Sequence, residues 1–168
     1  MADKAHMVDK LKTFDLIPVN SLGRSFKMRH VRNQVSEFLT HNTEYITWFQ
    51  QVVWYLTVYK PSHSMRAYLV VTPDGDAIGY GLVSLRDGQW NVTGALLESY
   101  RGQGIGRTLF KYLTQNALLS SGKDVYLDVR TTNIPALKLY ASLGYQPYAI
   151  DAENGVIKMK WSGTMAEA

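Results

Sequence analysis

Residues 93–122 read TGALLESYRGQGIGRTLFKYLTQNALLSSG, and this stretch decides the fold. An apolar run, Thr93 to Leu97, precedes a glycine-rich hexapeptide, Arg101 to Gly106. Apolar residues then recur at helical spacing until Gly122, which is typical of a helix stop; they are Leu109, Phe110, Leu113 and Ala117. The pattern predicts a strand, a glycine turn and a helix.

The glycine turn predicts an anion site. Glycines let backbone N–H groups approach a ligand closely, and a helix N-terminus adds positive partial charge, which suits a phosphate or pyrophosphate. The dinucleotide fingerprint G-x-G-x-x-G fails because Arg107 stands at its last position, and no Walker A string is present. An ordinary strand-to-helix turn without a ligand remains open for the hexapeptide alone.

A second block follows at residues 125–145, VYLDVRTTNIPALKLYASLGY. Its first part alternates apolar Val125, Leu127 and Val129 with polar residues, which indicates a strand with one buried face and Asp128 on the other. Asn133 then suits a helix N-cap, with a proline in the first turn and Gly144 as a C-cap.

The hexapeptide has the form R-x-x-G-x-G and resembles the acetyl-CoA pyrophosphate loop of the Gcn5-related N-acetyltransferase (GNAT) family. Asn133-x-x-Ala136-x-x-x-Tyr140-x-x-x-Gly144-Tyr145 resembles the second conserved block of that family. The resemblance is specific between residues 77 and 145. It implies a mixed α/β, α+β-like GNAT fold, in which a central sheet with antiparallel and parallel strands is flanked by helices.

The resemblance also implies an activity: direct acetyl transfer from acetyl-CoA to a primary amine, without an acyl-enzyme. The absence of cysteine excludes a cysteinyl intermediate, although a serine one stays open. A non-catalytic module that binds or senses acyl-CoA is the alternative. The acceptor stays open among small amines, amino sugars and protein N-termini. The cofactor-binding positions implied are Leu96 and Leu97 along pantetheine, then Arg101, Gly102, Gln103, Gly104, Ile105, Gly106, Arg107, Asn133 and Tyr140.

Two residues are candidates for acid–base chemistry. Tyr140 matches the tyrosine that commonly protonates the leaving thiolate, and a phenol keeps its proton at neutral pH; a packed aromatic is the alternative. Asp128 matches the position where ribosomal-protein N-terminal acetyltransferases carry glutamate. It is shorter by one methylene, so a direct base, a base acting through water and a structural acceptor all stay open. Glu98 ranks lower as a base, because it stands where the family often has proline.

The remaining patterns predict the other elements. A first strand is expected over residues 13–20, and two helices over residues 25–38 and 43–59. Strands are expected over residues 66–72, 77–86, 89–97 and 155–161, with turns at 73–76, 87–88 and 151–154. Four residues of the second helix repeat at helical spacing and are expected in the core, with a substrate cleft as the alternative: Trp48, Val52, Tyr55 and Leu56.

Composition is that of one globular domain. The chain has 168 residues, 46% of them hydrophobic, and no apolar run of membrane-spanning length. We expect the domain to span residues 13–161, between tails of residues 1–12 and 162–168. Residues 1–12 lack the apolar stretch of a signal peptide, which indicates a cytoplasmic protein, and residues not native to the chain are one explanation for this tail.

The charge of the chain does not point to a particular ligand or partner. The net charge is +4, and its densest cluster is Arg24, Lys27, Arg29, His30 and Arg32. A solvated helix face explains this cluster better than a nucleic-acid patch, because no nucleic-acid motif surrounds it. The histidines, at positions 6, 30, 41 and 63, lack metal-ligand spacing, so we expect surface residues and no metal. A monomer or a homodimer is expected.

Overall fold

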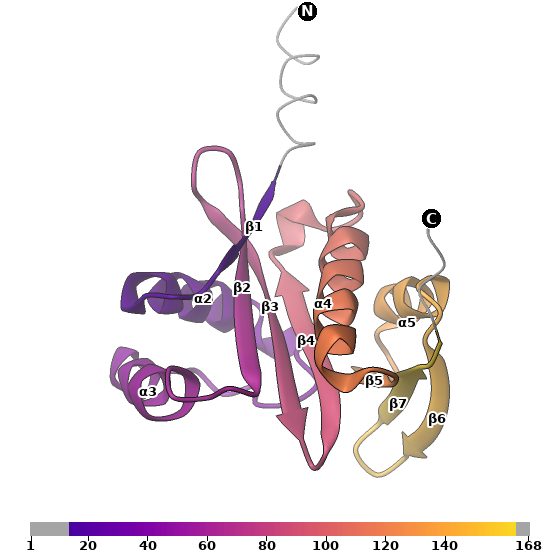
Figure 1. Ribbon diagram of the computed structural model, residues 1–168. Coiled ribbons are helices and arrows are strands. Elements are labelled where there is room, and N and C mark those ends of the chain that lie inside the picture. Colours follow the sequence, from indigo (N-terminus) through magenta and orange to yellow (C-terminus); the bar gives the residue numbers. More distant parts are fainter. Residues whose placement is uncertain (1–13, 164–168) are drawn as a thin grey trace, which may run out of the picture.

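The computed structural model describes residues 14–163, and Figure 1 shows their arrangement. Residues 1–13 and 164–168 lie outside the described residues, and they include all of the expected tail 1–12 and most of the expected tail 162–168. Seven strands form one sheet in the order β1-β2-β3-β4-β5-β7-β6. The strands are β1 (Asp15–Pro18), β2 (Met65–Val71), β3 (Ala77–Arg86), β4 (Gln89–Leu96), β5 (Val125–Arg130), β6 (Gln146–Asp151) and β7 (Val156–Trp161).

The helices cover both faces of this sheet. They are α2 (Leu22–Gln34), α3 (Trp48–Trp54), α4 (Ile105–Ser121) and α5 (Ile134–Ser142), with short turns η1 (Ser36–Phe38), η2 (Tyr55–Tyr59) and η3 (Glu98–Tyr100). The α2/α3 pair lies on one face and the α4/α5 pair on the other (Figure 1). The alternating residues of β5, from Val125 to Val129, are buried on the α4/α5 face as the sequence predicts. The mixed α/β fold class is thereby confirmed.

The parallel pair β4–β5 is the exception in a sheet whose other neighbouring strands are antiparallel. β3 and β4 pair along the full length of β4, but β4 and β5 are in register only at Asn91 and Tyr126. This shared position lies near the start of both strands, and the two strands run in the same direction. They are therefore paired near their amino ends and separate toward their carboxyl ends. The gap between those ends is called the β4–β5 divergence below.

Glycines end the elements where the sequence predicts. Gly122 closes α4 at φ +71°, and Gly144 follows α5 at φ +95°, a left-handed conformation that glycine adopts without a Cβ clash. Asp87 and Gly88 both have positive φ, at +50° and +75°. Two such residues between paired strands make the tight hairpin turn expected from Asp-Gly.

The helices before β2 differ from expectation. The helix expected over residues 25–38 begins at Leu22, because Ser21 accepts from the Arg24 amide and caps it, and it ends at Gln34. The helix expected over residues 43–59 begins only at Trp48. Thr47 and Gln50 form a reciprocal capping box there, which fixes the start of α3.

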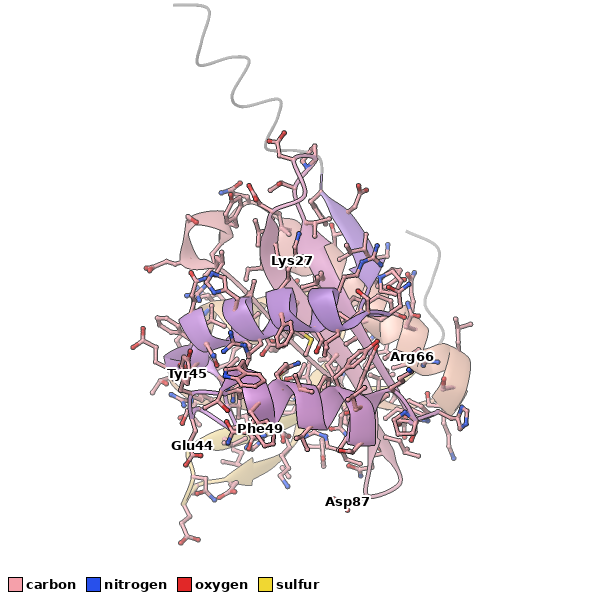
Figure 2. The ribbon with its side chains drawn as sticks, turned by 90° about the vertical axis from the view of Figure 1, so that its left-hand side faces the viewer. Lys27, Glu44, Tyr45, Phe49, Arg66 and Asp87 are labelled. Atoms are coloured by element: carbon pink, nitrogen blue, oxygen red, sulfur yellow. The ribbon has the colours of Figure 1, made fainter. Side chains whose placement is uncertain are left out.

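The core expectation for the α3 segment is only partly right. Tyr55 is buried, but Trp48 is 64% exposed and Leu56 is 51% exposed, so both are surface residues. Figure 2 shows the outer side of the α2/α3 layer, with Tyr45 and Phe49 also on it. The apolar residues that recur at helical spacing in this segment therefore lie partly in the core and partly on the exposed surface.

Candidate functional site

The glycine loop has the geometry that its sequence demands. Gly102 lies at φ +74°, and Gly104, the N-cap of α4, lies at φ +83°. A Cβ built on either residue meets no atom within 4 Å, so conformation, not crowding, requires glycine here. The first N–H groups of α4 have no partner within the helix, and they lie in this loop. The loop is therefore fitted to bind an anion.

Gly106 lies against side chains of two other elements. A Cβ at this position would lie 3.4 Å from the Leu139 side chain of α5 and 3.8 Å from that of Leu96 in β4, which is ordinary van der Waals contact. The start of α4, the helix α5 and the end of β4 thus meet at one point. The helix that carries Tyr140 therefore contacts the expected phosphate loop.

The long side chains of the loop bond to protein groups. Arg101 donates from Nε to the Leu96 carbonyl at 3.0 Å, and its guanidinium lies 4.5 Å from the centre of the Phe38 ring. Arg107 donates to Ser142 Oγ of α5 at 2.8 Å, and Gln103 donates to the Ser99 carbonyl at 3.0 Å. These side chains brace the loop, so its backbone N–H groups are the more suitable donors to a pyrophosphate.

Some backbone groups at the end of β4 already have hydrogen-bond partners within the protein. The Leu97 N–H donates to the Ile78 carbonyl at 2.9 Å, and the Leu96 carbonyl accepts from Arg101. Both residues were expected to run along pantetheine through backbone groups. The Leu96 carbonyl has two lone pairs, so a pantetheine that bonded it would share this acceptor with Arg101.

Tyr140 lies in the core between α4 and β5. It is 8% exposed and packs against Phe110 and Tyr145, with ring centroids 4.7 and 6.1 Å away. Burial raises the pKa of the Tyr140 hydroxyl well above its ordinary value, and the neighbouring Tyr145 raises it further. A phenol with a raised pKa keeps its proton at neutral pH, which suits a proton donor.

Asn133 is the N-cap of α5, as the sequence predicts. Its side chain accepts from the Ala136 amide at 3.2 Å and caps α5, the helix that carries Tyr140. Its expected contact with the cofactor stays a prediction.

Asp128 lies on the opposite face of β5 from the buried valines, as strand alternation predicts. Its side chain is 22% exposed, and its Oδ2 lies 2.8 Å from Nε2 of His41. Thr40 Oγ1 donates to the Asp128 carbonyl at 3.3 Å. Sequence reasoning treated His41 as a surface residue. No sequence signal could have paired it with Asp128, because 87 positions separate them.

The segment that carries His41 bridges the two sides of the β4–β5 divergence. On the β5 side, Arg130 donates to the Glu37 carbonyl at 3.0 Å, beside the contacts to Asp128. On the β4 side, Phe38 packs on Arg101. Residues 37–41 therefore lie across the gap between the carboxyl ends of both strands.

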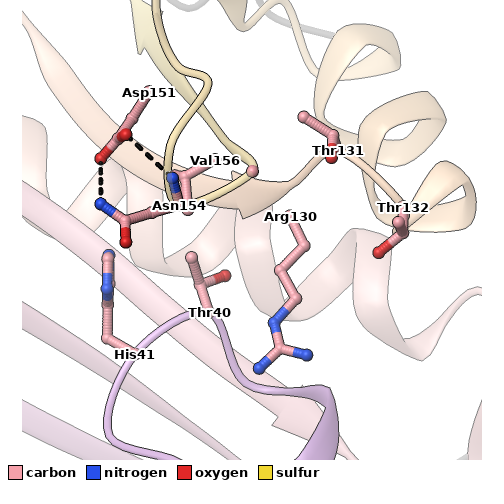
Figure 3. Close-up of a pocket in the computed structure, with 9 residues that line it drawn as sticks. Thr40, His41, Arg130, Thr131, Thr132, Asp151, Asn154 and Val156 are labelled. Carbon is pink, nitrogen blue, oxygen red and sulfur yellow. Dashed lines mark hydrogen bonds between the residues drawn. The ribbon is translucent and has the colours of Figure 1, made fainter.

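A cavity adjoins this segment on each side. One, of about 510 Å³, is lined by Thr40 and His41, by residues 130–132 and by the β6–β7 turn; Figure 3 shows His41 and Arg130 within it. The other, of about 490 Å³, lies between η1 and residues 97–101 and includes Glu98, the lower-ranked base candidate. Asp151 and Asn154 bond each other at the wall of the first cavity.

The basic cluster of α2 proves to be a set of braces. Arg32 is buried and donates to the carbonyls of Asn42 and Glu44, while Arg29 donates to the Ile46 carbonyl at 3.0 Å. Arg24 and Lys27 also donate to backbone carbonyls, elsewhere. The expected solvated face is thus wrong for Arg32, which is buried and donates to backbone carbonyls of the adjoining loop, whereas Lys27 and His30 are exposed as expected.

Burial lowers the pKa of Arg32, while Tyr80 and Glu44 oppose that shift. An arginine keeps its charge at physiological pH despite such a shift. The same burial raises the pKa of Tyr80 to about 12, with Arg32 opposing the shift. A charged Arg32 therefore clamps residues 42–44, the continuation of the segment that holds His41.

Replacing Arg32 with methionine is expected to release this clamp. Methionine fills similar space but donates no hydrogen bond, and hydrogen bonds from charged groups contribute about 1.5–3 kcal/mol each. Hydrogen exchange at the Ile46 amide, which donates to Asn33 Oδ1 at 3.0 Å, should then become about tenfold faster or more, as followed by mass spectrometry. Arg24→Met, at the other end of α2, is the matched control and leaves this amide protected; equal protection in both variants contradicts the clamp.

Residues 14–163 contain no helix long and apolar enough to cross a membrane. Over the same residues, no three side chains of histidine, aspartate or glutamate gather as a metal site would require.

Known proteins resemble most of this chain. The model of the GNAT acetyltransferase family matches residues 32–145. An N-alpha-acetyltransferase of Sulfurisphaera tokodaii is 27% identical over 140 residues, which cover 74% of this chain and 82% of that protein. A Bacillus subtilis protein, provisionally named a ribosomal protein bS18-alanine N-acetyltransferase, is 36% identical over 84 residues. That match covers 49% of this chain and spans only 56% of the relative.

Solved structures share the fold at low identity. A GCN5-related N-acetyltransferase from Kribbella flavida superposes with a TM-score of 0.72 at 17% identity, covering 89% of this chain and 97% of that one. The relatives are named N-acetyltransferases, and the family model covers both sequence blocks. This chain belongs to the GNAT acetyltransferase family.

Proposed function

We propose that this protein transfers an acetyl group from acetyl-CoA directly to a primary amine. One observation carries the proposal: the glycine loop opens α4 directly after β4, and α5, which carries the buried Tyr140, contacts this loop at Gly106. Asp128 lies on β5, the strand that is parallel to β4. The loop supplies backbone N–H groups for the pyrophosphate at the start of α4. The thioester then reaches into the divergence, past Leu96.

The two polar groups stand on opposite faces of the sheet. Tyr140 belongs to the α4/α5 side, and Asp128 belongs to the α2/α3 side. An amine that approaches from the Asp128 side attacks the thioester carbonyl, and the thiolate departs toward Tyr140. Its proton passes to the sulfur, while the ammonium proton leaves on the Asp128 side. Separate faces for acid and base suit direct transfer, because amine and thiolate need their protons moved in opposite senses.

The acceptor is proposed to bind in the 510 Å³ cavity. Its polar lining consists of three threonine hydroxyls, the Asn154 amide, His41, Arg130 and one carboxylate, Asp151, which already accepts from Asn154. A polyamine would need several free carboxylates to balance its charge. The lining therefore favours an acceptor with a single amine and hydrogen-bonding groups, such as a protein N-terminus or an amino sugar. Relatives are named for both protein N-termini and spermine or spermidine.

A panel of amines tests the proposal. Free thiol release is followed with acetyl-CoA and a short peptide with a free N-terminus, an amino sugar or spermidine. We expect release with a peptide or amino sugar and a product heavier by one acetyl group. If calorimetry finds acetyl-CoA bound but no amine releases thiol, the non-catalytic binding or sensing module becomes the better proposal.

Two further parts of the proposal rest on expectation. They are a cytoplasmic location and a monomeric or homodimeric state. A spermidine acetyltransferase of Vibrio cholerae with a similar fold is described as dodecameric, which is a property of that protein.

A further inference from the structure

We propose that His41 is the base that accepts the proton of the incoming amine, and that Asp128 positions it. The inference rests on the proposed acetyl transfer and names the atom that takes the proton. It starts from the 2.8 Å contact between His41 Nε2 and Asp128 Oδ2.

The contact fixes which nitrogen is free. An ionised carboxylate can only accept, so Nε2 carries the hydrogen that it donates to Asp128. The lone pair of a neutral His41 then lies on Nδ1. A carboxylate bonded to one ring nitrogen holds the ring in place and makes the other nitrogen a better proton acceptor.

Access separates the two residues. His41 lines the 510 Å³ cavity and its side chain is 49% exposed, whereas Asp128 is 22% exposed and is not among the residues that line that cavity (Figure 3). An acceptor in the cavity therefore meets the imidazole before the carboxylate. Imidazole is also the stronger base at neutral pH.

The fold holds His41 in this place from both sides. Thr40, the preceding residue, bonds the Asp128 carbonyl, and Arg32 clamps the carbonyl of Asn42, the following residue. Two neighbours anchored to different elements leave the His41 backbone little freedom. The segment lies across the β4–β5 divergence, where the thioester is proposed to end.

The step balances without another reactant. The ammonium gives one proton to His41 Nδ1, and the neutral amine nitrogen then bonds to the carbonyl carbon of the thioester. When the tetrahedral intermediate collapses, the carbon–sulfur bond breaks and the sulfur takes the proton of Tyr140. The nitrogen of the intermediate still carries one proton more than the amide product holds, and it passes that proton through solvent to the phenolate left at Tyr140. The histidinium returns its own proton to solvent through the open cavity.

The test uses the full chain with an amine that the wild-type protein acetylates. His41→Gln should lower kcat about a hundred- to ten-thousand-fold while acetyl-CoA affinity stays the same by calorimetry. Asp128→Asn should cost less. Adding it to His41→Gln should cost little more, because groups that act as one unit are not additive. His63→Gln, on the exposed turn before β2, is the matched control and retains full activity.

The pH profile gives a readout that a structural role would not move. A base acts only when it is unprotonated, so the wild-type rate is expected to fall as pH drops. That acidic limb should vanish in His41→Gln. The charged groups around His41 are Asp128 and Arg130 of β5, Lys158 opposite Asp128 in β7, and Asp151 of β6.

The outcomes are distinct. A His41→Gln variant that works at near wild-type rate, while Asp128→Asn fails, makes Asp128 the direct base and overturns the inference alone. A double variant whose losses multiply also overturns it, because the two groups would then act separately. A wild-type protein that binds acetyl-CoA but acetylates no amine contradicts the proposed function itself.

Discussion

Replacing Tyr140 with phenylalanine is expected to lower the rate of acetyl transfer about a hundred- to ten-thousand-fold, with acetyl-CoA affinity nearly unchanged. The substitution removes one oxygen from a ring that stays packed against Phe110 and Tyr145, so the fold should hold. What is lost is a proton donor beside the departing thiolate. Steady-state kinetics with an accepted amine, together with calorimetry for acetyl-CoA, measure both quantities.

Tyr145→Phe is the matched control for this prediction. Tyr145 is also buried and has a raised pKa, but its hydroxyl lies 2.7 Å from Thr114 Oγ1 inside the core. Its loss should cost about 1 kcal/mol of stability through that hydrogen bond and leave turnover per folded molecule unchanged. A Tyr140→Phe protein that behaves like this control removes Tyr140 from the mechanism.

The raised pKa of Tyr140 also fixes the sign of a pH effect. Burial favours the neutral phenol, so the acid stays protonated above the range where an exposed tyrosine ionises. Tyr140 therefore should impose no loss of activity on the alkaline side until well beyond the ordinary tyrosine range.

Replacing Gly104 with valine is expected to weaken acetyl-CoA binding about tenfold to a hundredfold. The residue lies at φ +83°, where a β-branched side chain is strained by about 1–3 kcal/mol. The loop can relieve that strain only by turning its backbone away from the left-handed region, which redirects the N–H groups at the start of α4. Titration calorimetry gives the affinity, and circular dichroism shows whether the protein is folded.

Gly75→Val separates strain from function. Gly75 lies in the turn between β2 and β3 at φ +87°, and it too has no atom within 4 Å of a built Cβ. The two variants carry similar backbone strain, but only Gly104 belongs to the glycine loop. Unchanged acetyl-CoA affinity in a folded Gly104→Val protein contradicts the assignment of residues 101–106 to the pyrophosphate.

The parts that the sequence predicted are those with strong local signals. The glycines that end α4 and α5, the Asn133 cap and the alternation in β5 each act over a few residues, and all were confirmed. The region before β2 depends on distant contacts. Residues 43–47 were expected in a helix, but Arg29, Arg32 and Asn33 of α2 bond the backbone there and favour a loop.

The candidate site divides in the same way. Gly104 and Tyr140 stand in blocks whose spacing is visible in the chain, whereas the partnership of His41 with Asp128 arises only when residues 37–41 cross the sheet. Trp48 and Leu56 show a further limit, because helical spacing of apolar residues does not say whether the face they form is covered.

The parallel pair β4–β5 has a consequence for cohesion. Strands β1 to β4 form one antiparallel ribbon and β5 to β7 another, and a single register position joins the two. Elsewhere along the boundary between β4 and β5, the packing of α4 and the hydrogen bonds between residues 37–41 and β5 hold the two ribbons together. A molecule bound in the gap would contact both ribbons, so it would stabilise their association as well as react. Substrate binding and the stability of the sheet would then depend on the same β4–β5 boundary.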